Sequence, residues 1–523
     1  MVNRNIHIDY KVFKKVGYKH FFLTLFFVIQ YHLTILAQQR PNIIVIISDD
    51  HTMQAIGAYG STYGISPNID KLAKEGVVLN RAFVTNSICA PSRAVLLTGK
   101  YSHINGHKDN LTKFDGSQDQ YQKYLQKAGY QTAWIGKWHL ESTPQGFDYW
   151  KVMPGQGAYY NTEFINMDSS RTKTDGYCTN IITDLATEWL DHVDKTKPFS
   201  LVVGHKATHR IWAPDTCDLG ALDTIKFPLP VNFYDSYKNR IAARDQDMSI
   251  EKTLQMGYDL KMYDDTTRLD GQYERMNKAQ RDRFFRYYNS IRHDFKKQNL
   301  SGKALTEWKY QRYMRDYLST AISLDRNIGR LMSYLEKNNL LENTLIVYTS
   351  DQGFYLGEHG WFDKRFMYEQ SMRTPMIIRY PSLIKKGTTI DELVMNLDLA
   401  PTFLDLAGLA VPKQMQGKSI LPLLKEEVKG EQWRKAVYYH YYEHPGEHNV
   451  YRHFGIRTSR YKLIRFYGSK SFWELYDLEK DPQEMVNLYD NKKYRKQTVA
   501  LKNELKELIY QYDDKEAAAI IEK

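Results

Sequence analysis

The segment Cys89-Ala90-Pro91-Ser92-Arg93, in the first quarter of this 523-residue chain, contains the residues whose types and spacing best suit a reactive site. Pro91 suits the first turn of a helix, where its missing N–H costs nothing. The free N–H groups and partial positive charge of a helix N-terminus favour an anion there. Arg93 adds a planar fork of donors that fits a tetrahedral oxyanion. Although an isolated cysteine is most often a packing residue, this context predicts an anion site with the Cys89 thiol at its mouth.

Three carboxylates and one amide follow two other segments that read as buried strands. The run 42–47 leads into Asp49-Asp50, and the run 344–349 leads into Asp351-Gln352. Hard oxygen ligands, with no cysteine or histidine required, favour Ca²⁺ or Mg²⁺ over zinc. Such an ion would polarise a bound oxyanion and hold a nucleophile in place.

Lysine and histidine side chains follow the remaining strand-like runs. These residues are Lys137 and His139 after 130–136, and His205, Lys206 and His209 after 198–204, with Lys364 downstream of Gln352. The lysines can neutralise an anion, and histidine transfers protons because it titrates near neutrality. One such cluster is most often a polar strand end entering a loop. Four clusters together predict a site, because ligands of open α/β sheets bind beyond the carboxyl ends of the strands.

The elements that must position these residues alternate between strands and helices. Continuous β-branched runs are typical of a parallel sheet, and we expect helices at 68–76, 119–129, 179–193, 311–338 and 399–406. The predicted fold is α/β, a large mixed, mostly parallel sheet sandwiched by helices. Short antiparallel strands and a closing helix at 492–511 predict a smaller C-terminal α+β subdomain.

We place the catalytic α/β domain at 38–425 and the C-terminal subdomain at 426–523. Residues 216–310 are rich in Tyr, Arg, Asp and Lys, and we interpret them as a helical and loop insertion. This insertion either borders the active site or is solvated without a function.

Residues 1–37 combine basic residues, an apolar run and Ala37 before Gln38, as a secretory signal peptide does. The alternative, a membrane anchor, is disfavoured by the polar interruption at Gln30 and His32. We therefore expect an exported protein, periplasmic or extracellular, with no stable membrane partner. The formal charge of +11 suits a polyanionic partner, which we do not expect to be a nucleic acid.

Three cysteines are too few for a disulfide scaffold in an exported protein. With Cys89 assigned to the anion site, Cys178 and Cys217 remain. The alternatives for these two are a disulfide and two ordinary packing residues.

The motifs together resemble those of the type I sulfatases of the alkaline phosphatase superfamily, in the same order and over about residues 40–490. The resemblance is carried by the Asp49-Asp50 pair, by 89–93 with 97–100, by Gly136-Lys137-Trp138-His139, and by Asp351-Gln352-Gly353 with Lys364. It implies an alkaline-phosphatase-like fold. It also implies that a maturation enzyme oxidises Cys89 to formylglycine, whose hydrate attacks sulfur.

The resemblance implies one Ca²⁺ held by Asp49, Asp50, Asp351, Gln352 and the modified Cys89. Most members of the family carry Asn where Gln352 stands. Arg93 would stabilise the hydrate, and His139 would help to break the sulfo-enzyme intermediate. The remaining residues, predicted to bind substrate, are Lys137, Lys364, Lys206, His205 and His209. The acid for the leaving alcohol is His209, with His205 as the alternative.

The runs 351–365 and 205–210 resemble exported bacterial sulfatases that act on sulfated glycans. We expect exo-acting removal of 6-O-sulfate from N-acetylglucosamine of glycosaminoglycan or mucin type. Candidate sugar contacts are Arg373, Glu443, His444, His448 and Arg452. The alternatives are a sulfatase acting on 2-O- or 4-O-sulfate of another polysaccharide, a phosphodiester or phosphonate hydrolase on the same fold, and a non-catalytic binder of sulfated glycans.

Overall fold

The strand β1 (Asn42–Ser48) is buried along its whole length, near the middle of a ten-stranded sheet. The computed structural model describes residues 40–264 and 271–522. Ile44 and Ile46 pack into one apolar core, whereas Ile43, Val45 and Ile47 pack into another. Because successive strand side chains point to opposite faces, the continuous β-branched run fills the cores on both sides of the sheet.

The large sheet is mixed, with a parallel centre. Its order is β11-β2-β10-β9-β1-β8-β4-β5-β6-β7. The bounds are β2 Val77–Leu79, β4 Gln131–Lys137, β5 Tyr149–Met153, β6 Glu163–Ile165, β7 Arg171–Lys173, β8 Phe199–Gly204, β9 Thr344–Ser350, β10 Met376–Arg379 and β11 Thr388–Ile390. The five strands from β9 to β5 run parallel, while β10, β6 and β7 join antiparallel. A separate pair joins β3 (Ala82–Phe83) to β12 (Val394–Met395). The predicted mixed, mostly parallel sheet is confirmed.

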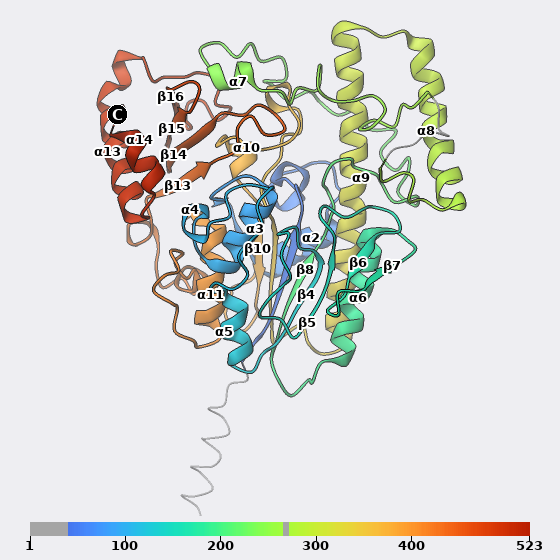
Figure 1. Ribbon diagram of the computed structural model, residues 1–523. Helices are drawn as coiled ribbons and strands as arrows, with labels where there is room; N and C mark the ends of the chain where they lie inside the picture. Colours follow the sequence, from blue (N-terminus) through green and yellow to red (C-terminus); the bar gives the residue numbers. More distant parts are fainter. Residues whose placement is uncertain (1–39, 265–270, 523) are drawn as a thin grey trace, which may run out of the picture. The chain divides into compact units, whose positions relative to one another are not determined.

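Helices cover both faces of this sheet (Figure 1). One core contains side chains of α2 (Pro67–Glu75), α6 (Cys178–His192) and α9 (Gly302–Lys337). The other contains side chains of α3 (Cys89–Thr98), α5 (Tyr121–Lys127) and α11 (Leu399–Leu406). The short helices α4 (Ser102–Asn105), α10 (Glu369–Met372) and α12 (Leu421–Leu424) lie in the connections.

The predicted C-terminal subdomain is confirmed as an antiparallel sheet with helices. The sheet has the order β13-β14-β15-β16, and its core includes side chains of α13 (Arg495–Gln511) and α14 (Lys515–Ile521). The strands are β13 Ala436–Tyr441, β14 Arg452–Thr458, β15 Tyr461–Tyr467 and β16 Phe472–Asp477. The described residues from Pro41 onward form one compact unit, and the boundary at residue 425 stays a prediction.

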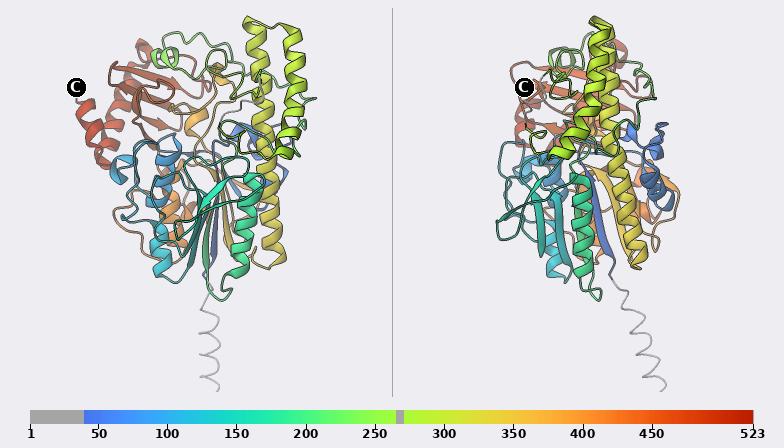
Figure 2. Two further views of the ribbon diagram at one scale, coloured as in Figure 1. Left: turned by 45° about the vertical axis from the view of Figure 1, so that its right-hand side comes forward. Right: turned by 90° about the vertical axis from the view of Figure 1, so that its right-hand side faces the viewer.

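The segment 216–310 contains helices and loops in the part that the structure describes. Its helices are α7 (Ile241–Asp245) and α8 (Lys278–Gln298). The helix α9 begins at Gly302, earlier than the predicted residue 311. α8 and α9 lie side by side (Figure 2), where the rings of Phe295 and Trp308 are 4.3 Å apart.

The predicted signal peptide, residues 1–37, lies outside the described residues. None of the helices that the structure describes contains a stretch long and apolar enough to cross a bilayer. All three cysteines are free. Cys178 is a packing residue with its Sγ 3.4 Å from the sulfur of Met153, whereas Cys217 is exposed. The possible disulfide between these two residues is therefore not present.

The close approach of β4 to β8 depends on Gly136. This residue has φ 101°, and a Cβ built on it would lie 2.1 Å from the carbonyl oxygen of Gly204. Gly129 also has a positive φ, 89°, but a Cβ there would meet nothing within 4 Å. In urea titrations we expect Gly136→Ala to lower the free energy of unfolding by about 3 kcal/mol and Gly129→Ala by about 1 kcal/mol. Equal losses would contradict the assigned contact.

Candidate active site

The three carboxylates predicted to bind a metal meet at the carboxyl ends of β1 and β9. These strands pair in parallel with Ser48 opposite Ser350, so Asp49-Asp50 and Asp351-Gln352 leave the sheet side by side. The backbone N–H of Asp50 donates to Asp351 Oδ1 at 3.2 Å. Oxygens of Asp49, Asp50 and Asp351 all lie within 4.8 Å of one another, and the three residues are buried.

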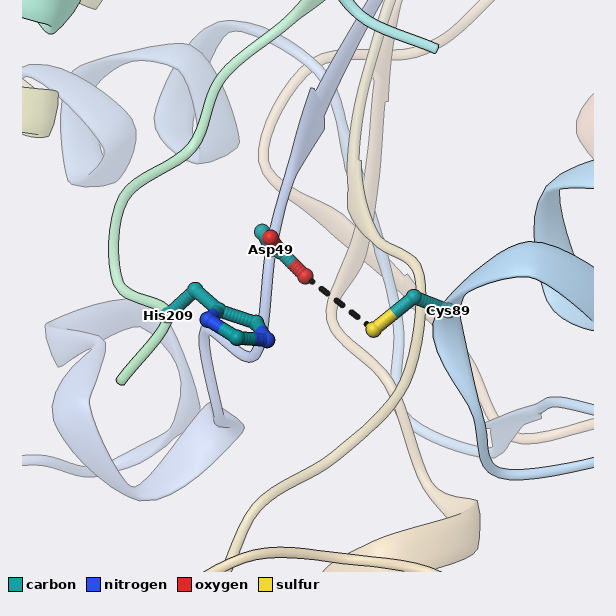
Figure 3. Close-up of side chains that lie close together, drawn as sticks. All are labelled: Asp49, Cys89 and His209. Atoms are coloured by element: carbon teal, nitrogen blue, oxygen red, sulfur yellow. Dashed lines mark hydrogen bonds between the residues drawn. The ribbon is translucent and has the colours of Figure 1, made fainter. Parts of the chain in front are cut away.

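Cys89 begins α3 and faces this cluster. Its Sγ lies 3.4 Å from Asp49 Oδ1, and the amide nitrogen of Gln352 lies 3.6 Å from the sulfur. His209 reaches the same place from the loop after β8, so Asp49, Cys89 and His209 converge from three segments (Figure 3). Burial raises the pKa of the Cys89 thiol. The unmodified side chain is therefore a neutral thiol, a weak nucleophile and a poor ligand for a hard cation.

Each carboxylate of the cluster has its own buried cation. Lys137 Nζ binds Asp49, and Lys364 Nζ donates to Asp50 Oδ2 at 2.7 Å. Arg93 donates to Asp351 Oδ2 from Nε at 3.0 Å and from Nη2 at 2.9 Å. The third nitrogen of Arg93 donates to the carbonyl oxygen of Lys137 at 3.0 Å. Three cations therefore surround the space in front of Cys89.

The nearby cations affect the pKa values of the three carboxylates to different extents. Burial alone would raise the pKa of Asp49, but Lys137, followed by His209 and Arg93, lowers it well below its ordinary value. Burial outweighs the attraction of Lys364 at Asp50 and raises its pKa to about 7. Burial and the neighbouring charge of Asp49 raise the pKa of Asp351 to about 6. A further cation is needed to keep all three ionised together near neutral pH.

Gln352 supplies a test of whether the site fits a hard divalent ion. Its Nε2 donates to Asp50 Oδ1 at 2.5 Å, while its buried Oε1 has no hydrogen-bond partner among the residues that the structure describes. Rotating the amide would turn the oxygen toward the carboxylates without breaking any hydrogen bond to that oxygen. Three carboxylates and an amide oxygen are the ligands that Ca²⁺ and Mg²⁺ prefer. The residues present therefore fit such an ion.

The predicted histidines fall into different surroundings. His209 Nε2 lies 3.9 Å from Asp50 Oδ2, and its Nδ1 faces the carbonyl oxygen of Arg210 at 2.7 Å. Burial, then Lys137, lowers the pKa of His139 well below its ordinary value, and its Nδ1 has no partner. Burial alone lowers the pKa of His205 to about 3. No hydrogen bond or ion pair joins the His205 ring to the described cluster residues, so His209 is the one that meets the carboxylates.

Lys206 lies behind Lys137, and both bind the same residue. Lys206 Nζ donates to the backbone oxygen of Gln156 at 3.1 Å, and Lys137 Nζ donates to the Gln156 side chain at 2.5 Å. Lys206 also lies over the ring of Tyr159, 5.0 Å from its centroid. Burial, followed by the charge of Lys137, lowers the pKa of Lys206 to about 8. Sequence reasoning missed Gln156, which no motif marks.

Two predicted sugar contacts, Arg373 and His444, are not brought to the cluster. Arg373 donates to the carbonyl oxygen of Asn80 at 2.5 Å and lines a separate cavity. The Nδ1 of His444 faces the carbonyl oxygen of Val450 at 3.1 Å, and its ring stacks on Tyr451. Their predicted contact with substrate stays a prediction.

Two further candidates, His448 and Arg452, have different neighbours. His448 Nε2 lies 3.3 Å from Asp363 Oδ2. Arg452 lies over the ring of Tyr467, 5.8 Å from its centroid. Of these two residues, His448 alone contacts a neighbour of Lys364 in the sequence. The sugar contacts predicted for both residues stay predictions.

A second layer of residues surrounds Lys364. Glu443 is a predicted sugar contact, and that contact stays a prediction, whereas Arg365 and Asn110 were not predicted. Arg365 is buried and donates to Asp363 at 3.1 Å, Glu443 at 2.9 Å and Glu447 at 2.8 Å. Glu443 Oε1 also accepts from the backbone N–H of Asn110 at 3.0 Å. The side-chain oxygen of Asn110 accepts from the backbone N–H of the residue after Cys89, at 3.1 Å. Arg365 could have been found because it directly follows Lys364 in the sequence, whereas no motif marks Asn110.

Two family models match this chain. "Sulfatase" matches residues 41–409, and "N-sulphoglucosamine sulphohydrolase, C-terminal" matches 357–511. The chain is 50% identical over 488 residues to an N-acetylglucosamine-6-O-sulfatase of Bacteroides thetaiotaomicron, covering 91% of this chain and 87% of the relative. It is 26% identical over 431 residues to the N-acetylglucosamine-6-sulfatase of Homo sapiens, covering 77% and 67%.

Solved structures resemble the chain along most of its length. One, in complex with its substrate D-glucosamine-2-N,6-O-disulfate, superposes with a TM-score of 0.89 at 50% identity and covers 91% of this chain and 99% of its own. The phosphonate monoester hydrolase of Agrobacterium radiobacter superposes with a TM-score of 0.66 at 20% identity, covering 90% and 96%. The second likeness shows the fold alone.

Proposed function

We propose that this chain, which belongs to the sulfatase family and is a sulfuric ester hydrolase, removes 6-O-sulfate from N-acetylglucosamine or glucosamine at the ends of glycosaminoglycan or mucin-type chains. The observation that carries the substrate assignment is 50% identity over 91% of the chain to an N-acetylglucosamine-6-O-sulfatase. The buried arrangement of Cys89, Asp49, Lys137, Lys364 and Arg93 supports the reaction type, because its fixed cations would surround a tetrahedral anion bound in front of Cys89.

The proposal includes two groups that the family implies. Asp49, Asp50, Asp351 and Gln352 would hold one Ca²⁺, as their hard oxygens and the unpartnered Gln352 Oε1 support. A maturation enzyme would convert Cys89 to formylglycine. The hydrated aldehyde supplies an oxygen nucleophile, and the ion supplies positive charge beside it.

Lys137 and Lys364 would bind the sulfate oxygens from two sides of the site. Both ammonium groups are held on carboxylates of the cluster and so are fixed before substrate arrives. Arg93 is anchored on Asp351 and on the backbone of Lys137, which orients its positive charge beside Cys89. These groups would stabilise the negative charge that develops on the transferring sulfate.

Proton transfer falls to the two histidines near the cluster. The carbonyl oxygen of Arg210 can only accept, so His209 carries its hydrogen on Nδ1, and Nε2 faces the carboxylates. When the ring is protonated, Nε2 carries a second hydrogen, and we assign to this Nε2–H the proton that the leaving alcohol takes up; the ring then returns to its neutral Nδ1–H form. His139, also near Lys137 and Asp49, would assist release of sulfate.

A panel of defined esters tests the proposed function. We expect sulfate release from glucosamine 6-O-sulfate and N-acetylglucosamine 6-O-sulfate, and far slower release from 2-O- and 4-O-sulfated sugars. Faster turnover of matched phosphate esters or phosphonates would overturn the sulfatase assignment. Faster release of 2-O- or 4-O-sulfate would overturn only the proposed position.

The charge of Lys206 predicts an alkaline limit to substrate binding. Its pKa of about 8 means that Lys206 is charged below this pH and neutral above it. An anionic substrate is attracted only by the charged form, so we expect KM to rise as pH increases through about 8, by about threefold to tenfold. Lys206→Arg stays charged and should shift this rise to higher pH. An unchanged KM profile in Lys206→Arg would show that another group titrates.

We also propose export to the periplasm or the cell exterior, which the basic and apolar pattern of residues 1–37 supports. Fractionation of cells that produce the full chain tests this. Enzyme retained in the cytoplasmic fraction at its full mass would contradict it.

A further inference from the structure

A large cavity lies away from Cys89. It has a volume of about 950 Å³, and none of the cluster residues lines it. Its walls come from the loop after β1, from α10, and from the turn between β14 and β15. The cavity is therefore bordered by both the large sheet region and the C-terminal subdomain.

Four arginines and four acidic residues line this cavity, but their charges are not evenly paired. Arg457 binds Glu369 at 3.1 Å, and Arg460 binds Glu479 at 2.9 Å. Glu369 also binds Lys462 at 2.9 Å, whereas Arg373 lies 3.9 Å from that carboxylate. Glu369 is thus shared among three cations, of which Arg373 is the most distant.

Arg81 and Arg373 have the weakest carboxylate contacts of the four arginines, because Arg373 lies 3.9 Å from Glu369 and otherwise donates to the carbonyl oxygen of Asn80. Within residues 40–264 and 271–522, no hydrogen bond or ion pair is made by the Arg81 side chain. Burial lowers the pKa of Arg373, and the charges of Arg457 and Arg81 act in the same direction against Glu369. Two like charges that face one cavity favour an anion between them.

Two buried polar atoms of the lining residues also have no hydrogen-bond partner in the described part of the chain. They are Nε of Arg373 and the side-chain oxygen of Gln370. Buried polar atoms are normally paired, and leaving one unpaired is costly. A ligand with an anionic group beside a hydroxyl offers an acceptor to the arginines and a donor to the Gln370 amide.

We propose that this cavity is a second saccharide subsite, which binds a sugar unit bearing a carboxylate or a sulfate. The choice of a glycan rests on the proposed function, while the anionic character rests on Arg81 and Arg373. The cavity is large enough for a sugar unit, since ligand sites commonly measure about 300–1,000 Å³. It would retain an acidic glycan on the enzyme independently of the sulfate ester at Cys89.

The test uses a probe that is not a substrate, a heparin-derived hexasaccharide chemically stripped of 6-O-sulfate. Calorimetric titration of the wild-type chain should show binding that weakens with salt. Arg81→Ala and Arg373→Gln should each weaken it by at least about tenfold, as loss of a charged hydrogen-bonding partner does. Arg495→Ala removes an exposed arginine of α13 and is the matched control, which should bind normally.

Measurements of the hydrolysis rate distinguish a failure of the proposed subsite from a failure of the proposed function. Arg81→Ala should hydrolyse glucosamine 6-O-sulfate at the wild-type rate while binding the hexasaccharide poorly, which also shows that the variant is folded. Unchanged hexasaccharide affinity in both cavity variants would overturn the subsite. Equal affinity for inorganic sulfate and the hexasaccharide would reduce it to an anion site and also overturn the proposal. Failure of 6-O-sulfate release in the wild-type chain would overturn only the proposed function.

Discussion

Cys89→Ala is expected to reduce sulfate release by at least about 10⁴-fold, because it removes the side chain that we propose is converted into the oxygen nucleophile. The neutral, buried thiol cannot take over the reaction in unconverted protein, since burial raises its pKa. The measurement is sulfate release from glucosamine 6-O-sulfate, together with mass spectrometry of the peptide that contains residue 89. Wild-type protein should show activity in proportion to its converted fraction.

Cys89→Ser gives a matched control for this loss. It retains a polar atom near Asp49 and Gln352, as the sulfur does at 3.4 Å and 3.6 Å. In a host that converts only cysteine, the serine variant should be as inactive as the alanine variant while unfolding at the wild-type temperature. Substantial turnover by Cys89→Ala would remove Cys89 from the nucleophile role, whether or not the protein is a sulfatase.

The parallel core of the fold was predictable because burial on both faces leaves a clear pattern. The run that forms β1 is apolar at every position from Ile43 to Ile47, and these residues divide between two cores. The strands β6 and β7 were not predicted, because they are three residues long and partly or fully exposed. Short edge strands are fixed by their neighbours rather than by their own sequences.

The candidate site was predictable where chemistry follows a strand directly. Asp49 and Asp351 meet because β1 and β9 are parallel neighbours in register. This proximity was predictable because each residue directly follows a predicted strand. Arg373 illustrates the limit of this reasoning. Arg373 is a predicted sugar contact, but its side chain donates to the carbonyl oxygen of Asn80 and lines the separate cavity. The direction of a loop side chain depends on tertiary contacts that sequence spacing does not contain.

The layer around Arg365 shows how the site is joined to the C-terminal subdomain. Arg365 binds Glu443, which follows β13, and Glu443 holds Asn110 against the start of α3. The residue next to Cys89 is thus linked through two side chains to the second sheet. These contacts connect the start of α3, where Cys89 lies, to the C-terminal subdomain.

Removal of the proposed divalent ion with a chelator should abolish turnover and make stability depend on pH. Without an ion, the pKa of Asp50 is about 7 and that of Asp351 about 6, both above the values of an unfolded chain. Groups raised in this way stabilise the fold below pH 4 and lose that contribution as pH rises toward 7. The free energy of unfolding of the chelated protein should therefore fall by about 2–4 kcal/mol between pH 5 and pH 8.

Calcium-loaded protein should not show this loss, because the ion keeps the carboxylates ionised in the fold. The gap in Tm between loaded and chelated samples should consequently widen from pH 5 to pH 8, and added Ca²⁺ should restore activity. Asp351→Asn should lower ion affinity and leave the Arg93 charge without its partner, whereas Asp282→Asn on exposed α8 should change neither property. A Tm gap independent of pH would show that Asp50 and Asp351 do not bind the ion.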